Sequence, residues 1–289
     1  MKQFKDKVAI VTGGGSGIGQ ALCQELGQRG SMVVVADIND DHSENVASAI
    51  TQNGGRAHAV HVDVSSEENV RQLINGTVSE YGRLDYLFNN AGVAIFGDAR
   101  DLTLEQWRRV LEVNLYGVLY GTVIAYSIMV RQGSGHIVNV ASSAGLYPGP
   151  TEVPYCTSKY GIVGLSLSLR VEGADLGVKV SVVCPGYVRT NIFQTATVIN
   201  VPPEHRGAMN PRKIMGASKA APIVLNPRKI MDASKAARTI LGGVSRNQAI
   251  IAFPAGVRLT WCLYRLSPRL MDRLLLYAIR NFRKYRLNP

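Results

Sequence analysis

A chain of 289 residues that is 46% hydrophobic and 18% charged has the ordinary composition of a soluble globular protein with one large domain. Its four cysteines show neither metal-ligand spacing nor a disulfide framework, so we expect free thiols, no metal site and a reducing compartment. The net charge of +11 is uneven, because residues 1–197 hold 15 basic and 18 acidic side chains, whereas residues 198–289 hold 17 and 3.

Short strand-like runs alternate with segments of helical length along the chain. We expect strands at Lys7–Val11, Met32–Ala36, Ala57–Val62, Tyr86–Phe88, His136–Val140, Lys179–Val183 and Ala249–Phe253. Helices are expected at Gly17–Arg29, Glu67–Tyr81, Leu104–Val113 and Tyr155–Leu176. This alternation predicts an α/β fold with a doubly wound parallel sheet in one domain, residues 1–256, whose ligand crevice lies at the carboxyl ends of the strands.

Two apolar runs could be taken for membrane-spanning or export segments. The first, residues 8–11, superficially looks like part of a signal peptide, but it breaks into glycines and is better used as the first strand. The longest, Val118–Val130, is shorter than the about 20 residues that a bilayer requires. We therefore expect a cytoplasmic protein.

The segment TGGGSGIG, residues 12–19, follows the first strand directly and precedes a helical pattern. This strand, turn and helix context is the one that a phosphate cradle requires. Gly13, Gly17 and Gly19 allow the backbone to approach a pyrophosphate, while the helix N-terminus supplies N–H donors. The turn predicts a dinucleotide site.

Asp37 ends the second strand, where a carboxylate can accept hydrogen bonds from both hydroxyls of a ribose and repel a 2′-phosphate. Neither Ser16 in the turn nor Ile38 adds a positive charge that would favour that phosphate. Asp37 therefore predicts NAD rather than NADP. The alternative is that Asp37 only caps the following helix.

Tyr155 and Lys159 are spaced so that they share one face of a helix. A free tyrosine, with a pKa of about 10, is a poor base at neutral pH, so a nearby ammonium is needed to stabilise the phenolate. Lys159 supplies that charge, and the pair predicts proton transfer to or from a substrate.

The order of these motifs resembles that of the classical short-chain dehydrogenase/reductase family over about residues 5–200. The elements that carry the resemblance are the glycine turn, Asn89-Asn90-Ala91-Gly92, Asn114, Ser142, Tyr155, Lys159 and Pro185-Gly186. The resemblance implies a Rossmann fold and an NAD-dependent oxidoreductase that interconverts a secondary alcohol and a ketone.

The resemblance also implies a role for each catalytic residue. Ser142 would donate to the substrate oxygen, with the adjacent Ser143 left as an alternative. Tyr155 would take the proton of the alcohol as hydride leaves for NAD. Lys159 would also hold the nicotinamide ribose, and Asn114 would hold a water that connects Lys159 to solvent.

Further cofactor contacts follow from the resemblance. Asp63 and Val64 would contact the adenine, the loop at residues 90–92 would lie beneath the adenosine ribose, and Val188 and Thr190 would contact the nicotinamide amide. The full expected set is Gly13, Ser16, Gly17, Ile18, Gly19, Asp37, Asp63, Val64, Asn90, Ala91, Gly92, Tyr155, Lys159, Pro185, Gly186, Val188 and Thr190.

We expect an apolar substrate that is steroid-, retinoid- or alkyl-like. The residues expected at the pocket mouth are apolar: Leu146, Tyr147, Pro148, Val153 and Phe193. One alternative is a 3-oxoacyl-thioester reductase whose acidic carrier docks on the basic C-terminal third. An alternative of another class is a non-catalytic nucleotide-sensing protein. The family resemblance further implies a homodimer or homotetramer built through the helices that contain Asn114 and Tyr155.

The segment at about residues 190–243, the substrate lid in the family, contains a tandem repeat. Residues 210–225 match residues 226–241 at 12 of 16 positions. Each copy opens with Asn-Pro, which predicts the start of a short basic helix, and Gly242-Gly243 predicts the end of the second. The duplication either reshapes the pocket or is tolerated in a surface segment.

Residues 257–289 form a basic, amphipathic C-terminal extension. From Arg269 onward one expected face is apolar and another is basic; the apolar face holds Met271, Leu275, Ala278, Phe282 and Tyr285, and the basic face holds Arg269, Arg273, Arg280 and Lys284. Such a helix can lie on an anionic membrane surface, pack on another subunit or cover the pocket mouth. A solvated basic face is the simpler alternative, and no nucleic-acid-reading module is recognisable.

Overall fold

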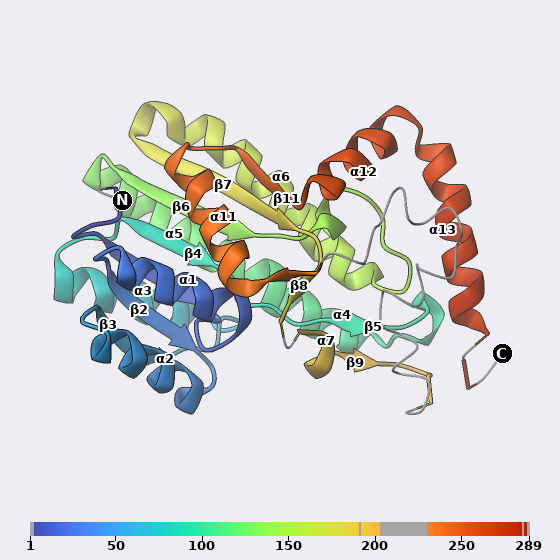
Figure 1. The fold of residues 1–289 in the computed structure, drawn as a ribbon, viewed down its shortest axis with the longest axis horizontal. Helices are drawn as coiled ribbons and strands as arrows, with labels where there is room; N and C mark the ends of the chain where they lie inside the picture. The colour runs from blue at the N-terminus through green and yellow to red at the C-terminus, as the bar shows by residue number, and fades with distance from the viewer. Residues whose placement is uncertain (1–2, 191, 203–229, 285, 288–289) are drawn as a thin grey trace.

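The computed structural model describes residues 3–190, 192–202, 230–284 and 286–287. Its centre is a parallel sheet of seven strands in the order β11-β7-β6-β4-β1-β2-β3 (Figure 1). The strands are β1 (Val8–Thr12), β2 (Met32–Asp37), β3 (Arg56–His61), β4 (Tyr86–Asn89), β6 (Gly135–Val140), β7 (Val178–Pro185) and β11 (Ile250–Phe253). All seven predicted strands are confirmed, with ends displaced by one or two residues, and the doubly wound α/β fold is confirmed with them.

The sheet reverses its order at β1, which pairs with β2 on one side and with β4 on the other. The chain segments that leave β1 and β4 therefore turn to opposite faces, and a crevice opens at their carboxyl ends. The glycine turn after β1 and the Asn89-Asn90 segment at the end of β4 both lie at this point.

Helices cover both faces of the sheet (Figure 1). One hydrophobic cluster joins the sheet to α1 (Gly17–Gln28), α2 (Asp40–Gln52) and α11 (Ala233–Ser245). A second cluster joins it to α3 (Glu67–Tyr81), α5 (Gly117–Gln132) and α6 (Val153–Gly173). Because both faces are covered, strands such as β1 are buried along their whole length.

One helical segment passes through an irregular turn. Helix α4 (Leu104–Leu111) continues into a π-helical turn at Glu112–Tyr116 and then into α5. The run Val118–Val130, expected to be too short for a membrane, thus belongs to a longer helical segment, Leu104–Gln132. By length and composition alone this segment could span a bilayer, although 56% of its most apolar window is buried inside the protein. Its packing against the sheet accounts for its apolar character.

The second half of the segment expected to form the substrate lid differs from the prediction. The strand β10 (Met231–Asp232) pairs with β8 (Val188–Arg189), so the second repeat is extended there and α11 begins only at Ala233. The helix runs through Gly242-Gly243 to Ser245, and the predicted end at these glycines is wrong. A Cβ atom on Gly243 would lie 2.7 Å from Ile251, so this glycine serves close packing of α11 on β11. The first repeat and the Asn226 start lie outside the described residues.

The C-terminal extension consists of α12 (Ala255–Leu266) and α13 (Pro268–Arg283). As the spacing predicts, Met271, Ala278 and Phe282 share the buried face of α13, whereas Tyr285 lies outside the described residues. Phe282 packs against Val201. Two ion pairs fasten the end of the chain to the loop after the short strand β5 (Ile95–Phe96): Arg283 to Asp98 at 2.7 Å and Arg286 to Asp101 at 2.6 Å.

Candidate active site

The glycine turn has the backbone conformation that the sequence requires. Gly13 and Gly17 have φ angles of 63° and 53°, which favour glycine over any residue with a side chain. A Cβ atom on Gly19 would lie 2.0 Å from the carbonyl oxygen of Gly13, so α1 is packed directly beneath the turn. The N-terminus of α1 therefore faces the space above the turn with free N–H donors.

Asp37 lies against this turn. Its Oδ2 accepts a hydrogen bond from the backbone N–H of Gly15 at 2.9 Å, and its Oδ1 accepts one from Asn39 at 3.0 Å. The side chain that caps α2 is that of Asn39, so the alternative role of Asp37 as the helix cap is wrong. Each carboxylate oxygen has a further lone pair with which it can accept a hydrogen bond from a ribose hydroxyl.

Asn90 ties the ends of β1 and β4 together. Its Nδ2 donates to the carbonyl oxygens of Thr12 and Gly13 at 3.0 and 3.2 Å, and the Thr12 hydroxyl accepts hydrogen bonds from the N–H groups of Asn90 and Ala91. These bonds fix the crevice floor before any ligand binds.

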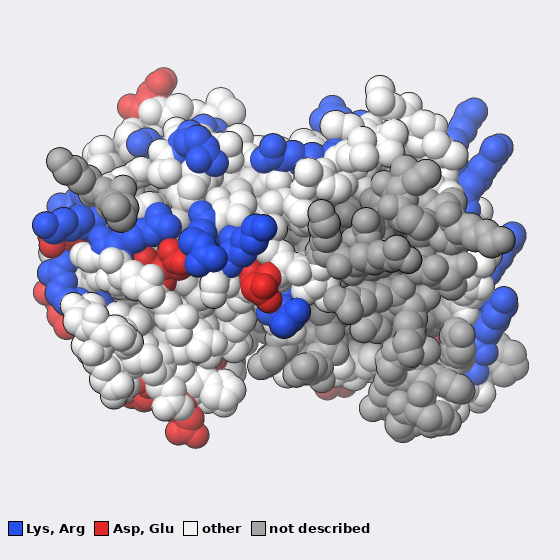
Figure 2. Space-filling view, viewed as in Figure 1, with Lys and Arg blue, Asp and Glu red and all other residues white. Residues whose placement is uncertain are grey.

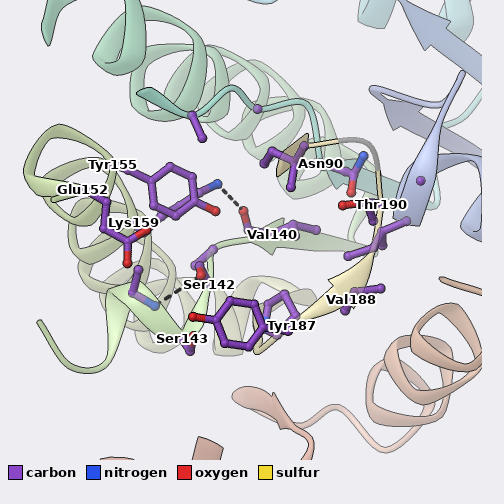
Figure 3. A pocket seen from close by; sticks show the side chains of 18 of the residues that line it. Asn90, Val140, Ser142, Ser143, Glu152, Tyr155, Lys159, Tyr187, Val188 and Thr190 are labelled. Carbon is purple, nitrogen blue, oxygen red and sulfur yellow. Dashed lines mark hydrogen bonds between the residues drawn. The ribbon is translucent and has the colours of Figure 1, made fainter. Parts of the chain in front are cut away.

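Tyr155 and Lys159 lie on the first turns of α6, and Ser142 follows β6 (Figure 3). Lys159 is buried; its Nζ donates to the carbonyl oxygen of Val140 at 3.0 Å and lies 5.4 Å from the centre of the Tyr155 ring. Ser142 accepts a hydrogen bond from the N–H of Ala144 and is also hydrogen-bonded to Tyr155. Ser143 is instead hydrogen-bonded to Tyr147, which favours Ser142 over its neighbour.

The protonation equilibria of this pair are set by burial. Burial lowers the pKa of Lys159 to about 8. Burial raises the pKa of Tyr155 well above its usual value and the Glu152 carboxyl raises it further, while the hydrogen bond with Ser142 opposes both. The neutral phenol is thus the resting form, and the ammonium charge of Lys159 titrates just above neutrality.

Asn114 is fully buried in the π-helical turn. Its Oδ1 accepts from the N–H of Val93 at 2.8 Å, and its Nδ2 donates to the carbonyl oxygen of Val93 at 2.9 Å and to the Ser158 hydroxyl at 3.3 Å. The side chain therefore positions the loop after β4 against α6. Irregular π turns of this kind are frequent at functional sites.

One cavity joins the glycine turn to the Tyr155 cluster. The expected residues that line it are Gly13, Ser16, Gly17, Ile18, Asn90, Ala91, Gly92, Ser142, Tyr155, Lys159, Pro185, Gly186, Val188 and Thr190. Gly19, Asp37 and Asn114 lie outside its lining and support the turn or the loop around it. His42 also lines it, a position that no sequence signal indicated.

Asp63 and Val64 do not line this cavity. The Asp63 carboxylate accepts hydrogen bonds from the backbone and the hydroxyl of Ser65 at 2.9 and 2.6 Å, and Val64 is buried against Gly117. In this structure both residues hold the turn that leads into α3.

Most of the residues expected at an apolar pocket mouth do not line the cavity. Leu146 and Tyr147 are buried in a core cluster with Val257, Pro148 and Val153 are absent from the cavity lining, and the side chain of Phe193 is not described. The residues that line the substrate end are Ala94, Phe96, Ala144, Pro150, Thr151, Glu152, Tyr187, Ile192 and Thr195. This wall is mixed rather than wholly apolar.

The described part of the chain contains no group of three or more His, Cys, Asp or Glu side chains that could hold a metal ion. The four cysteines are unpaired, and three of them are buried.

Comparisons with known proteins show which family this chain resembles. Residues 7–198 match the sequence profile of a family described as short chain dehydrogenase. A cyclohexanol dehydrogenase from Acinetobacter sp. (strain SE19) is 36% identical over 205 residues, which cover 70% of this chain and 82% of that protein. A meso-2,3-butanediol dehydrogenase from Serratia marcescens is 33% identical over 214 residues, which cover 74% and 82% respectively.

The fold also has solved counterparts. A short chain dehydrogenase/reductase from Burkholderia phymatum, solved in complex with NAD, superposes with a TM-score of 0.78 at 28% identity, covering 94% of this chain and 97% of that chain. Since the profile spans most of the sheet and the relatives exceed 30% identity over most of their own length, this chain belongs to the short-chain dehydrogenase family of oxidoreductases.

Proposed function

We propose that this enzyme interconverts a secondary alcohol and a ketone with NAD as cofactor. The observation that carries the proposal is the single cavity that joins the glycine turn to Ser142, Tyr155 and Lys159. A nucleotide-sensing protein would need the turn alone, so the second half of the cavity favours an enzyme.

The residues present fit NAD. The turn offers backbone N–H donors to a pyrophosphate, and the Asp37 carboxylate beside it accepts from ribose hydroxyls and repels a 2′-phosphate. When bound, NAD supplies the hydride acceptor. Pro185, Gly186, Val188 and Thr190 would hold its nicotinamide end, and Asp63 and Val64 would contact the adenine beyond the lining of this cavity.

The chain's own residues carry the proton. Ser142 donates to the substrate oxygen and places it beside the Tyr155 hydroxyl. Tyr155 takes the alcohol proton during oxidation and returns it during reduction. Lys159, held by the Val140 carbonyl and within 5.4 Å of the Tyr155 ring, stabilises the phenolate and binds the nicotinamide ribose. Asn114 positions the loop behind Lys159 and lies beside the expected path of water to solvent.

An apolar secondary alcohol is the substrate we propose, with the Acinetobacter cyclohexanol dehydrogenase as the supporting relative. A 3-oxoacyl-thioester reductase is the competing activity. Its acidic carrier would need basic side chains near the cavity, whose described lining includes Lys159 but no arginine.

A panel of alcohols and ketones tests the function and its cofactor together. We expect the wild type to oxidise cyclohexanol with NAD, and to prefer NAD over NADP by at least about tenfold in kcat/KM, because the Asp37 charge repels the 2′-phosphate. Asp37→Ser should reduce this preference for NAD over NADP. The measurement is NADH or NADPH absorbance. Equal use of both cofactors by the wild type would contradict the role of Asp37, and turnover of acyl-thioesters alone would favour the competing activity.

We further propose a homodimer or homotetramer whose contacts use the helices that carry Asn114 and Tyr155. Large apolar side chains are exposed on these helices: Leu104, Tyr116, Val123, Tyr160 and Val171. A second copy of the chain would cover them, since exposed apolar residues on adjoining helices of one protein are typical of subunit contacts.

The exposed face of the C-terminal extension favours contact with an anionic membrane surface. Arg269, Arg273, Arg280 and Lys284 are exposed on α13, and among the described residues none of them has an ion-pair partner. Basic side chains line the edge of the molecule that α13 forms (Figure 2). Leu266 at the end of α12 and Leu270 and Leu276 on α13 are also exposed, as at a membrane interface. We propose that the enzyme is cytoplasmic and binds such a surface peripherally.

Charge reversal tests the membrane contact without disturbing the tail's packing. We expect the wild type to co-sediment with phosphatidylserine vesicles at low salt, and R273E/R280E to lose most of this binding, because each basic residue contributes about 1 kcal/mol near such a surface. The matched control is R131E/K179E, which reverses two exposed charges outside the tail. If wild type and both variants stay in solution while R273E/R280E alone changes its molar mass by light scattering, the face is a subunit contact.

A further inference from the structure

Glu152 places a carboxyl group in the cavity wall three residues before Tyr155. It occupies the N-cap position of α6, yet its side chain makes no capping hydrogen bond. Figure 3 shows it beside Tyr155, with Ser142 and Ser143 close by. Among the described residues its carboxylate has neither a hydrogen bond nor an ion pair, so it is an acceptor with no partner.

The carboxylate lies close against the backbone at Gly149. A Cβ atom there would lie 2.0 Å from the Glu152 Oε1, so the glycine leaves room for the carboxylate in the place it occupies. The charge is felt by the surrounding groups, since it contributes to the raised pKa values of Tyr147, Tyr155 and Tyr187. Glu152 thus lines the cavity together with Tyr155 and Tyr187.

An unpartnered carboxyl group in such a place is unfavourable for the empty site. Burial raises the pKa of Glu152 to about 7, because the charged form loses hydration there. The neighbouring wall is otherwise partly apolar, with Phe96, Pro150 and Ile192 in it. A pocket of this kind uses a few polar groups to orient its ligand, and a ligand that satisfies the carboxyl binds better than a bare hydrocarbon.

We propose that Glu152 is a specificity-determining residue that accepts a hydrogen bond from a second hydroxyl group of the substrate. This inference rests on the proposed alcohol dehydrogenase activity and narrows its substrate class to diols and hydroxyketones whose remaining carbon skeleton is apolar. A hydroxyl donor fits better than an ammonium group, because burial disfavours the charged carboxylate, and a carboxyl keeps an acceptor oxygen whether or not it is ionised. Tyr155 and Ser142 act on the reacting oxygen, while Glu152 holds the other.

The test compares alcohols that differ only in the second hydroxyl. We measure kcat/KM with NAD for cyclohexanol, 1,3-cyclohexanediol and 1,4-cyclohexanediol, in the wild type, Glu152→Leu and Glu152→Gln. At least one diol should exceed cyclohexanol in the wild type. Glu152→Leu should lower the ratio of that diol to cyclohexanol by at least about tenfold, mainly through KM, because a hydrogen bond to a carboxylate is lost. Glu152→Gln, which keeps an acceptor oxygen, should lower it less.

Controls separate this role from a structural one. Glu172→Leu removes an exposed carboxylate from the same helix and should leave the ratio unchanged. If Glu152→Leu lowers Tm and slows all three alcohols equally, or if neither Glu152 variant changes the ratio, the inference is overturned while the dehydrogenase activity stands. If the wild type oxidises none of the alcohols and reduces none of the corresponding ketones, the proposed function itself fails, and the inference fails with it.

Discussion

Tyr155→Phe should reduce kcat by at least about 100-fold, since a positioned proton donor contributes about 10²–10⁴-fold to such reactions. The substitution removes one oxygen atom and leaves the ring beside Lys159 in place. NADH affinity should therefore stay within a few-fold of the wild type. Turnover is followed by NADH absorbance and binding by NADH fluorescence.

The same helix offers a matched control for this loss. Tyr160 is half-exposed, is hydrogen-bonded to Tyr264 and is absent from the cavity lining. Tyr160→Phe should keep a near-wild-type kcat and cost about 1 kcal/mol of stability at most. Retention of more than about a tenth of wild-type kcat by Tyr155→Phe would remove Tyr155 from the proton path.

Gly19→Ala should abolish useful cofactor binding. The new Cβ would lie 2.0 Å from the Gly13 carbonyl oxygen and 2.6 Å from Nδ2 of Asn90, so both the turn and the residue that ties it to β4 must move. We expect a stability loss of about 1–3 kcal/mol, typical of overpacking. NADH affinity should fall at least about tenfold, because the displaced N–H donors no longer converge on the pyrophosphate.

A second glycine separates this local clash from the general effect of added methyl groups. Gly76 lies in α3, and a Cβ atom there would meet nothing within 4 Å. Gly76→Ala should be neutral or stabilising by up to about 1 kcal/mol, with NADH affinity unchanged. Thermal unfolding and NADH titration measure both variants. Wild-type NADH affinity in Gly19→Ala would show that the turn does not hold the cofactor.

The sheet could be predicted because parallel strands that are covered on both faces appear in the sequence as continuous apolar runs. The glycine turn could also be predicted, because its residues lie within one turn. Tyr155 and Lys159 could be predicted because their spacing places both side chains on one face of a helix. These features depend on neighbours a few residues away, so the local sequence is enough to define them.

The substrate wall could not be predicted in the same way. Tyr147 and Glu152 are five residues apart, yet the first is buried in the core and the second lines the cavity. Which of them turns inward depends on packing against β7, β11 and α12, elements that follow later in the chain. The π turn at Asn114 and the run of α11 through Gly242-Gly243 likewise involve residues outside the helix itself, Val93 in one case and Ile251 in the other.

The ion pairs at the end of the chain connect groups 185 residues apart, Arg283 with Asp98 and Arg286 with Asp101. During synthesis, the cofactor half of the sheet can form from segments that have already left the ribosome, since domains fold from the N-terminus onward. The loop at residues 98–101 must wait for Arg283 and Arg286 to be translated. A nascent chain that stalls in α13 would thus have a folded nucleotide site, while the loop at residues 98–101 would lack its ion pairs.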